Sequence, residues 1–474
     1  MIVLILLFAF SAVLAISTVI KTVRARKLSP SEKEYSDAEI QDYSLRLQKM
    51  IQCKTISFKG SFDDIEFAKL RDVVQELFPL VHKNAAKLTF GDDCWIYKIS
   101  GKDDSRNIML MSHHDVVAAE GDWKYGPFSG EIADGKIWGR GTVDTKTPLF
   151  AEFSALEELL SKGFEFPCNV YIGSSHNEEI AGDGIPKALE YFKKHNICFE
   201  VILDEGGAVI DPPLAGMKCE KCAMVAVHEK GRYKLNCKAL SGTGHAGLTS
   251  AVKSTPVERM AGFIQEVTAK DVFIRRLNPQ VTAMFEALGP YCKFPMNILF
   301  CNLWLFGGFL KKIMPKLNPQ AGGLIGTTCA FHNIEGSSDS KCCTAVAMLR
   351  SVDEADMYRD IETLKNIAAK YGVEIGESDD SEYHGPADMN QPGYAYIMEC
   401  LAKCFPQYPA SPFILPAGTD ARTLTEICTC VLRFAPIRLS SQQLGSVHSE
   451  NENIDLTSIA EAVAFYKFFV ANYR

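Results

Sequence analysis

The sequence predicts an α/β fold in which helices flank a mixed, mostly parallel sheet. Strands are expected at residues 94–99, 108–111, 168–172 and 200–203, and helices at residues 148–160 and 185–195. This βαβαβ order is typical of parallel strands that are joined and covered by helices. Clusters of His, Asp and Glu follow or close the strand-like runs. Their side chains are therefore expected at the carboxyl edge of the sheet, where open α/β sheets bind ligands.

The length and charge of the chain limit its partners. A chain of 474 residues can form two or three domains with substantial cores. Its formal net charge of −8 argues against nucleic acid or an anionic membrane as the main partner, because such partners are met by clustered Lys and Arg. A small-molecule substrate is expected instead.

Residues 1–28 are interpreted as a transmembrane anchor or a signal segment. Residues 2–20 are apolar apart from two Ser and one Thr, and the run is long enough to span a bilayer as a helix. Basic residues follow it, so the positive-inside rule places the rest of the chain in the cytoplasm. The sixteen Cys lack the spacing of a disulfide framework, which also favours a reducing compartment. The alternative is a cleaved signal peptide, with Val13-Leu14-Ala15 as an imperfect cleavage pattern, which would make the protein secreted or lumenal.

The remaining residues divide into a larger domain and an insert. Residues 29–226 form the first part of the larger domain, which begins with helices at 38–52 and 62–78. Residues 227–380 change the pattern, with strands at 231–240, 326–333, 342–352 and 373–375 and helices at 256–273 and 355–371. This βαββαβ order is typical of a small α+β domain. Residues 381–474 return to the larger domain, with helices at 394–404 and 458–471.

One segment of the insert, residues 294–317, is unusually apolar. Gly307-Gly308, Pro295, Pro315 and the pair Lys311-Lys312 interrupt it too often for a membrane-spanning helix. Packing within the insert explains it most simply. The alternatives are an apolar wall for a lipid-like or bulky substrate, and a membrane-facing surface.

The strand ends and one distant loop offer the ligands that a pair of metal ions needs. Two zinc ions that share a bridging water require roughly five protein ligands from imidazoles and carboxylates. The chain has a candidate for each ligand position: His113, Asp144, Glu179, Asp204 and His448. Glu178 stands beside one of them as a free carboxylate. One such residue alone would more often be structural, whereas five in this context point to a metal site.

Here the sequence resembles the aminoacylase and carboxypeptidase family of co-catalytic zinc hydrolases, metallopeptidase family 20 of clan MH. It looks closest to the branch of carboxypeptidase S and the N-fatty-acyl-amino-acid hydrolases. The resemblance runs from about Leu45 to Phe469 and rests on these motifs: His113-x-Asp115-Val116-Val117, Gly139-Arg140-Gly141 with Asp144 and Lys146, Glu178-Glu179, Asp204-Glu205-Gly206, Gly244-His245, Gly418-Thr419-Asp420-Ala421-Arg422, and Val447-His448 with Glu452. The segments 297–317 and 324–329 also resemble that branch.

The resemblance implies how the five ligands are shared between the ions. His113 and Asp204 would bind one zinc ion, Glu179 and His448 the other, and Asp144 would bridge them. It also implies a zinc-peptidase catalytic domain, a lid and dimerisation role for the insert, and a cis bond between Asp144 and Thr145. Co²⁺ or Mn²⁺ could replace zinc.

Roles for the neighbouring residues follow from the same resemblance. Asp115 would accept the N–H of His113 and fix its ring, while His114 should point elsewhere because strand side chains alternate. Glu178 would take a proton from the water between the zinc ions and deliver it to the leaving amine.

Two further residues are implied away from the ligands. His245 would reach across a homodimer interface and donate to the oxyanion. Arg422 is a candidate clamp for a substrate carboxylate, although an ion pair with Asp420 or another neighbour is the alternative.

Two departures from the family pattern bear on the substrate. The family commonly has Gly-His-Ser-Ser where this chain has Gly-His-Ala-Gly at 244–247, and Asn-x-x-Pro where this chain has residues 337–342. The missing Asn concerns recognition of a substrate carboxylate, and neither change touches the metal ligands.

The leading hypothesis is a membrane-anchored or cytoplasmic zinc amidohydrolase or carboxypeptidase that releases an amino acid from a short peptide or an N-acyl amino acid. The alternatives are a carnosinase-type dipeptidase and, from another class, a non-catalytic binding domain on the same fold. The latter should have lost ligands, and here all five candidates and the candidate base remain. The sequence leaves open the exact substrate and whether hydrolysis or condensation occurs in the cell.

Overall fold

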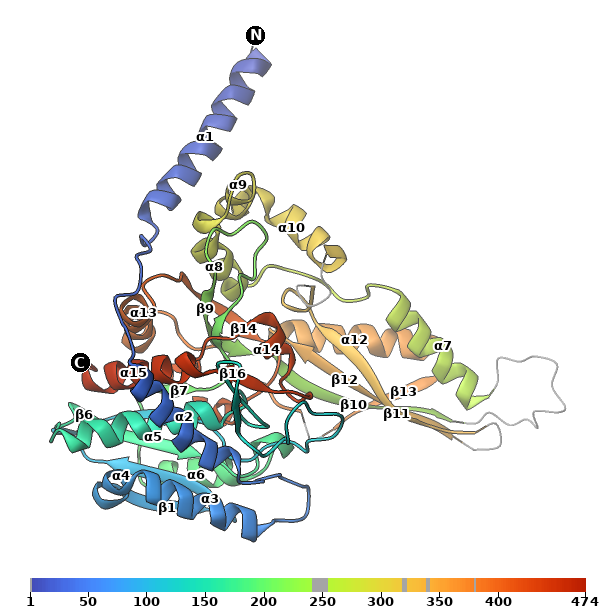
Figure 1. Ribbon diagram of the computed structural model, residues 1–474. Coiled ribbons are helices and arrows are strands. Elements are labelled where there is room, and N and C mark those ends of the chain that lie inside the picture. The colour runs from blue at the N-terminus through green and yellow to red at the C-terminus, as the bar shows by residue number, and fades with distance from the viewer. Residues whose placement is uncertain (1, 241–254, 318–321, 338–341, 379–380) are drawn as a thin grey trace.

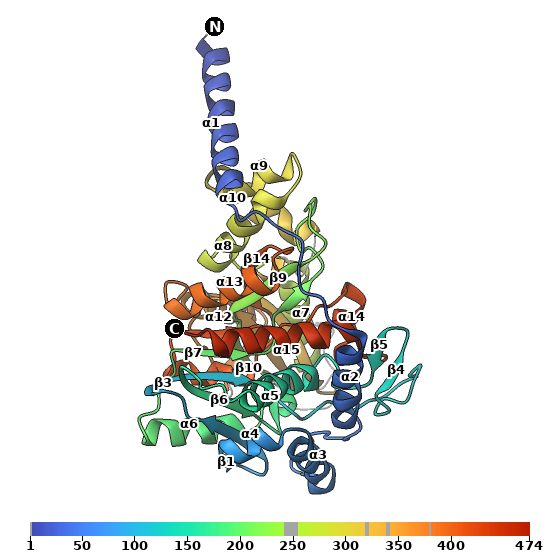
Figure 2. The same cartoon turned by 60° about the vertical axis from the view of Figure 1, so that its left-hand side comes forward.

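The computed structural model describes residues 2–240, 255–317, 322–337, 342–378 and 381–474, with side chains from Phe10 onward and without that of Leu317. Figures 1 and 2 show a body built around a large sheet, a smaller sheet beside it, and an N-terminal helix that extends away from the body. The α/β class that the sequence predicts is confirmed.

The large sheet has nine strands in the order β1-β2-β6-β3-β7-β15-β9-β14, with β8 paired to β9. Neighbours β6, β3, β7 and β15 run parallel, as do β9 and β14, whereas β1, β2 and β8 pair antiparallel. The strand bounds are β1 (Ala86–Phe90), β2 (Cys94–Ile99), β3 (Asp103–Met111), β6 (Cys168–Ser174), β7 (Val201–Asp204), β8 (Ala208–Ile210), β9 (Cys222–Glu229), β14 (Ala410–Leu415) and β15 (Val431–Arg433).

Helices flank this sheet, as the apolar periodicity predicts. Helices α2, α5 and α15 pack on one another, α13 packs on α15, and α6 packs against β1 and β2. Their buried faces join the strands in one core that includes Trp95, Phe150 and Phe465. The helix bounds are α2 (Asp37–Ile51), α3 (Asp64–Leu77), α4 (Pro79–Asn84), α5 (Lys146–Ser161), α6 (Gly184–Lys194), α13 (Pro392–Cys404), α14 (Ser441–Gly445) and α15 (Leu456–Ala471).

The insert contains a second sheet, which lies to the right of the first in Figure 1. Its four strands are antiparallel in the order β11-β12-β10-β13, and α7 and α12 pack on it. The chain therefore follows the expected βαββαβ order, with bounds β10 (Gly231–Leu240), α7 (Pro256–Ala269), β11 (Thr328–Glu335), β12 (Cys342–Ser351), α12 (Glu354–Lys370) and β13 (Val373–Glu377). A small three-stranded sheet joins β4 (Glu131–Ala133), β5 (Lys136–Trp138) and β16 (Asn453–Asp455).

The apolar segment 294–317 forms two helices with distinct faces. These helices are α9 (Met296–Cys301) and α10 (Leu303–Leu317), which follow α8 (Pro279–Leu288) and the 3₁₀ turn η2 (Gly289–Tyr291). Phe300, Leu303 and Leu310 are buried in a cluster with α8, so packing explains one face of the segment. The other face is exposed.

The N-terminal residues form helix α1 (Ile2–Arg24), whose side chains are described from Phe10. Over the residues that the structure describes, no helix is long and apolar enough to cross a membrane, so the expected membrane anchor has no support from this finding. All sixteen Cys are free thiols.

Candidate metal centre

The sheet brings most of the candidate ligands to one edge. His113 follows β3, Glu178 and Glu179 lie on the 3₁₀ turn η1 (Glu178–Ile180) after β6, and Glu205 follows β7. These three strands are adjacent and parallel, so their carboxyl ends meet at the same edge. Asp144 stands just before α5 on the same edge.

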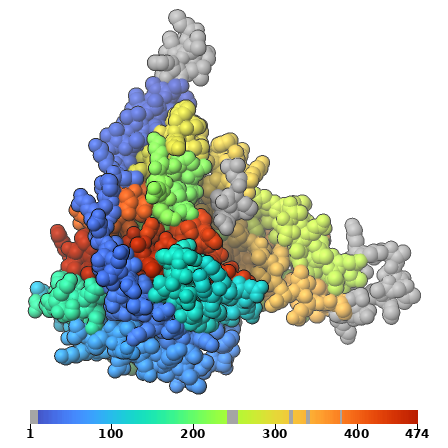
Figure 3. All heavy atoms as spheres, in the orientation of Figure 1, coloured from blue at the N-terminus to red at the C-terminus, as the bar shows by residue number. Residues whose placement is uncertain are grey.

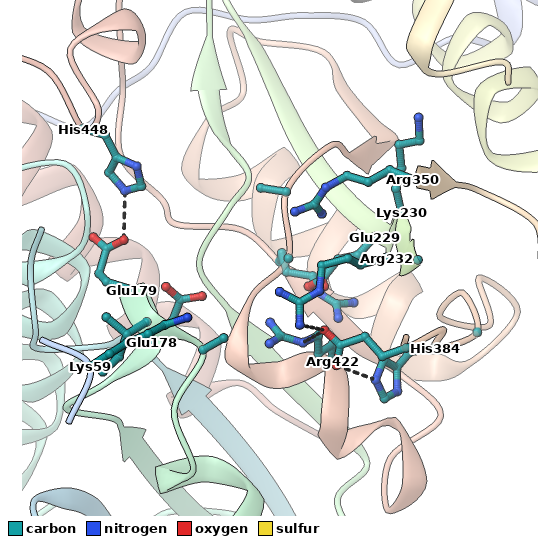
Figure 4. Close-up of a pocket in the computed structure, with 18 residues that line it drawn as sticks. Lys59, Glu178, Glu179, Glu229, Lys230, Arg232, Arg350, His384, Arg422 and His448 are labelled. Atoms are coloured by element: carbon teal, nitrogen blue, oxygen red, sulfur yellow. Dashed lines mark hydrogen bonds and ion pairs between the residues drawn. The ribbon is translucent and has the colours of Figure 1, made fainter. Parts of the chain in front are cut away.

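Asp144 lies between two imidazoles, one at each of its oxygens. His113 Nε2 is 2.8 Å from Asp144 Oδ1, and His448 Nε2 is 3.1 Å from Asp144 Oδ2. His448 Nε2 is also 3.0 Å from Glu179 Oε2, the contact drawn in Figure 4. The donor atoms of His113, Asp144 and Glu179 all lie within 4.8 Å of one another. One carboxylate can therefore serve two neighbouring ion positions. The Asp144–Thr145 peptide bond is cis, as the resemblance implies.

Asp115 contacts both His113 and the turn that carries Glu178 and Glu179. Its Oδ1 is 3.2 Å from Nδ1 of His113, and its two carboxylate oxygens accept from the backbone N–H groups of Glu178 and Glu179 at 3.2 Å each. One buried carboxylate thus orients an imidazole and fixes the turn that carries two more acidic residues. His114 points away as strand alternation predicts, stacked on Trp95 at 4.0 Å between ring centroids.

The structure brings Glu205, not Asp204, into the cluster. Glu205 Oε1 is 3.5 Å from His113 Nε2, and Glu205 forms a second group of potential donors with His113 and Glu178. Asp204 belongs to neither group of donors found among the described residues, and its Oδ2 accepts from the backbone N–H of Ala421 at 3.2 Å. The motif is the one that the sequence singled out, but the carboxylate that faces the site is one residue later.

The residues present suit a bound cation. His113, Asp144 and Glu179 have no Lys or Arg among their ion-pair partners within the described parts of the chain. Glu179 Oε1 is buried and has no hydrogen-bond partner there. Hydrogen bonds with Asp144 and Glu179 raise the pKa of His448 to about 10. Burial opposes a charge on His113, yet the carboxylates of Glu205, Asp115 and Asp144 raise its pKa well above the usual value. The cluster thus favours positive charge at its centre.

Glu452 is a positioning residue whose role the sequence did not reveal. Its buried carboxylate pairs with Arg140 at 2.6 Å and accepts from the backbone N–H groups of Gly141, Val143 and Asp144 at 3.1, 2.7 and 3.2 Å. It therefore holds the loop that presents Asp144 and ties that loop to the segment that carries His448. The motif that includes Val447 and His448 also includes Glu452, but nothing in it indicated that this carboxylate holds the Asp144 loop.

A cavity of about 380 Å³ connects the acidic cluster to a group of cationic side chains. Glu178, Glu179 and His448 line one side, and Lys230, Arg232, Arg350 and Arg422 line the other (Figure 4). The cavity therefore has an end lined by carboxylates and an imidazole and an end lined by cationic side chains.

Arg422 and Arg350 differ in their partners. Arg422 Nε forms an ion pair with Glu382 Oε1 at 3.2 Å but makes no hydrogen bond within the described residues, and its Nη1 donates to the carbonyl of Thr419 at 2.8 Å. The pair with a neighbour that the sequence left as an alternative is present, although Glu382 rather than Asp420 is the partner. No hydrogen bond or ion pair of the Arg350 side chain is found in the described residues. Burial lowers the pKa of Arg350, and Arg232 and Arg422 lower it further, while Glu229 and Glu382 raise it. His245 lies outside the described residues.

Comparisons with known proteins agree with this geometry. The model of peptidase family M20/M25/M40 matches residues 109–472. The chain is 28% identical to the N-fatty-acyl-amino acid synthase/hydrolase PM20D1 of Xenopus tropicalis, over 97% of this chain and 92% of that protein. It is 27% identical to the probable carboxypeptidase S-like 2 of Dictyostelium discoideum, over 98% and 92%. The branch that the motifs resemble is therefore confirmed.

Among solved structures, that of human carnosine dipeptidase 1 superposes with a TM-score of 0.62 at 15% identity, covering 92% of this chain and 96% of that one. At this level of sequence identity the match shows the fold alone.

Replacing Glu452 by Gln should destabilise the protein by about 3–5 kcal/mol, because Arg140 would stay buried without its counter-charge. The midpoint of urea unfolding measures this. Glu450→Gln is the matched control, since Glu450 is exposed on the same loop and should change stability by less than about 0.5 kcal/mol. Equal midpoints for the two variants would contradict the positioning role.

Proposed function

Because the chain belongs to peptidase family M20/M25/M40 and is a metal-dependent hydrolase of amide bonds, we propose that it releases an amino acid from short peptides or N-acyl amino acids. The cavity that joins the acidic cluster to the cationic wall is the observation that carries this proposal. An N-acyl amino acid has an amide bond and a free carboxylate a few bonds apart, which matches the two ends of the cavity.

We assign two zinc ions to the cluster. His113, Asp144, Glu179 and His448 are the proposed ligands, with Asp144 between the ions, and Glu205 replaces Asp204 as the fifth ligand. This set of imidazoles and carboxylates suits zinc, and Co²⁺ or Mn²⁺ could substitute. When bound, the ions would supply a water of lowered pKa and polarise the amide carbonyl.

Glu178 is the proposed general base and acid. It lines the cavity beside the cluster, and burial raises its pKa well above the usual value, helped by Asp420 and Asp115. A carboxyl group of raised pKa can hold the proton that it takes from the attacking water and release it to the leaving amine. Asp115 keeps Glu178 at this position through the backbone of η1.

Arg350 is the proposed anchor for the substrate carboxylate. Its desolvated guanidinium lines the cavity and makes no hydrogen bond or ion pair with the described residues, so a substrate carboxylate would provide both charge and hydrogen bonds. Arg422, which the resemblance favours for this role, is engaged by Glu382 and would act as a secondary contact.

The acyl group is proposed to be apolar. Support comes from the relatives named as N-fatty-acyl-amino acid synthase/hydrolases, whose similarity extends over nearly the whole chain. The carnosinase-type dipeptidase remains the alternative.

We also propose that the chain forms a homodimer through the insert, with His245 of one copy reaching the other, and that residues 2–20 anchor it to a membrane. Sedimentation of the detergent-solubilised chain as a monomer would refute the dimer, and extraction from membranes by carbonate would refute the anchor.

The zinc-loaded full chain should release free amino acids from N-acyl amino acids or dipeptides of varied length, measured by mass spectrometry. Glu178→Gln should retain zinc yet lose activity by a factor of at least about 100, since general acid–base catalysis typically contributes 10²–10⁴-fold. Release from neither substrate class, or full activity of the variant, would defeat the proposal.

The choice between Glu205 and Asp204 is tested by zinc content. Glu205→Gln should reduce bound zinc from two ions per chain toward one, because an amide is a poor zinc ligand. Asp204→Asn is the adjacent control and should keep both ions in the folded protein. Elemental analysis after dialysis measures the zinc content without an activity assay. If Asp204→Asn loses zinc and Glu205→Gln keeps it, Asp204 and not Glu205 is the ligand.

Arg350→Gln should lower kcat/KM for an N-acyl amino acid by about 10–150-fold, the range expected for a lost hydrogen bond to a charged group. The same substrate with its carboxylate converted to a carboxamide serves as the control, since it lacks the anion that Arg350 is proposed to bind. If both substrates lose activity equally, Arg350 acts on the fold or the cavity and does not recognise the carboxylate.

A further inference from the structure

The exposed apolar side chains of this protein are concentrated at one tip. Ten of the eighteen large apolar side chains that are exposed among the described residues lie on α1 or on the segment 294–317. On α1 these are Phe10, Val13, Ile16, Val19, Ile20 and Val23, and on the other segment they are Phe294, Trp304, Leu305 and Phe309. Figure 3 shows the two segments side by side at the top of the molecule. A concentration of this kind marks an interaction surface.

Specific contacts hold the two segments together. The rings of Phe10 and Trp304 meet edge to face at 6.4 Å between centroids, and Asn302 Nδ2 donates to Thr18 Oγ1 at 2.9 Å. Lys21 pairs with Glu286 of α8 at 2.9 Å. The side chains of α1 and α10 therefore form one continuous surface, which we call the apolar tip.

Helix α10 has the pattern of a helix that lies at a membrane interface. Leu303, Leu310 and Met314 face the core, whereas Trp304 and Phe309 are 63% and 54% exposed. An exposed aromatic face on a helix whose other face is anchored by packing is the arrangement found in interfacial helices. Trp is a residue that membrane interfaces favour.

The charged side chains described on α1 and α10 are all basic. Lys311, Lys312 and Lys316 are exposed on the second half of α10, and α1 ends with Arg24 and with Lys21, which pairs with Glu286. Neither helix contains an Asp or Glu. The chain as a whole carries a charge of −8, so this basic region is a local feature that the total charge conceals.

We propose that the apolar tip docks on the surface of a lipid bilayer that contains anionic headgroups. Trp304 and Phe309 would enter the boundary between headgroups and acyl chains, and Lys311 and Lys312 would contact anionic headgroups. A second copy of the chain fits less well as the occupant, because a two-fold contact through this surface would bring the Lys residues of both copies together.

The test uses the full chain reconstituted into vesicles whose acyl chains carry bromine, which quenches Trp fluorescence at short range. The chain has four Trp, and Trp95 is buried in the body. Vesicles of phosphatidylcholine with phosphatidylserine should quench the wild type, and Trp304→Phe should remove most of that quenching. Equal quenching of the two proteins would overturn the proposal.

A charge variant tests the role of the headgroups. Lys311→Gln/Lys312→Gln should abolish the preference of Trp304 quenching for vesicles with phosphatidylserine over vesicles without it. Lys162→Gln/Lys194→Gln, at exposed positions on the body, should keep that preference. Loss of the preference in both double variants, or in neither, would reject anionic headgroups as the partner.

Two measurements separate this inference from other outcomes. Brominated lipid should quench Glu178→Gln as strongly as the wild type, because docking does not depend on catalysis. A failure of the docking would therefore leave the proposed hydrolysis standing, and a failure of the hydrolysis would leave the docking standing. If Trp304 is protected from brominated lipid and cross-links to Trp304 of a second copy, the surface is a contact between copies and the docking is refuted.

Discussion

The crowding of carboxylates around His113 is the interaction on which the rest of the site depends. Asp144, Glu178, Glu179 and Glu205 converge there, and burial makes their mutual repulsion costly. The surrounding structure holds these groups in fixed places. Asp115 lies against His113 Nδ1 and accepts from the backbone of η1, and Glu452 accepts from three backbone N–H groups of the Asp144 loop. The register of β3, β6 and β7 makes this possible, because it brings three strand ends together without a long connecting loop.

The sequence predicted elements whose hydrophobic periodicity is strong. The core helices α2, α5 and α15 and the strands β2, β6 and β7 lie within a few residues of where the pattern puts them. Short strands such as β8 and β15 were missed, because three residues carry too little periodicity to distinguish a strand from a loop.

Within the site, the sequence pointed to the motifs but not to the side-chain contacts that their residues make. At Asp204-Glu205 the strand β7 ends, so side-chain alternation no longer tells which carboxylate faces the ligands. At Arg422 the sequence left an ion pair open as an alternative but could not identify Glu382 as the partner, since Glu382 lies 40 residues away in the sequence. Arg350 gave no signal, because its distinguishing feature is a side chain without a hydrogen bond or ion pair to the described residues, which only the three-dimensional structure can reveal. For the segment 294–317 the sequence left three interpretations open. The structure shows that one face of the segment packs in the core and that the other face is exposed.

The order of the site residues along the chain bears on biosynthesis. Glu452 holds the loop of Asp144, which precedes it by more than 300 residues. A growing chain therefore carries the acidic strand ends before it has the segment that organises them. Domains generally fold as units while N-terminal parts emerge first from the ribosome. The cluster can thus reach its final geometry only after residues 448–452 have been synthesised, long after the strand ends of β3, β6 and β7 have emerged.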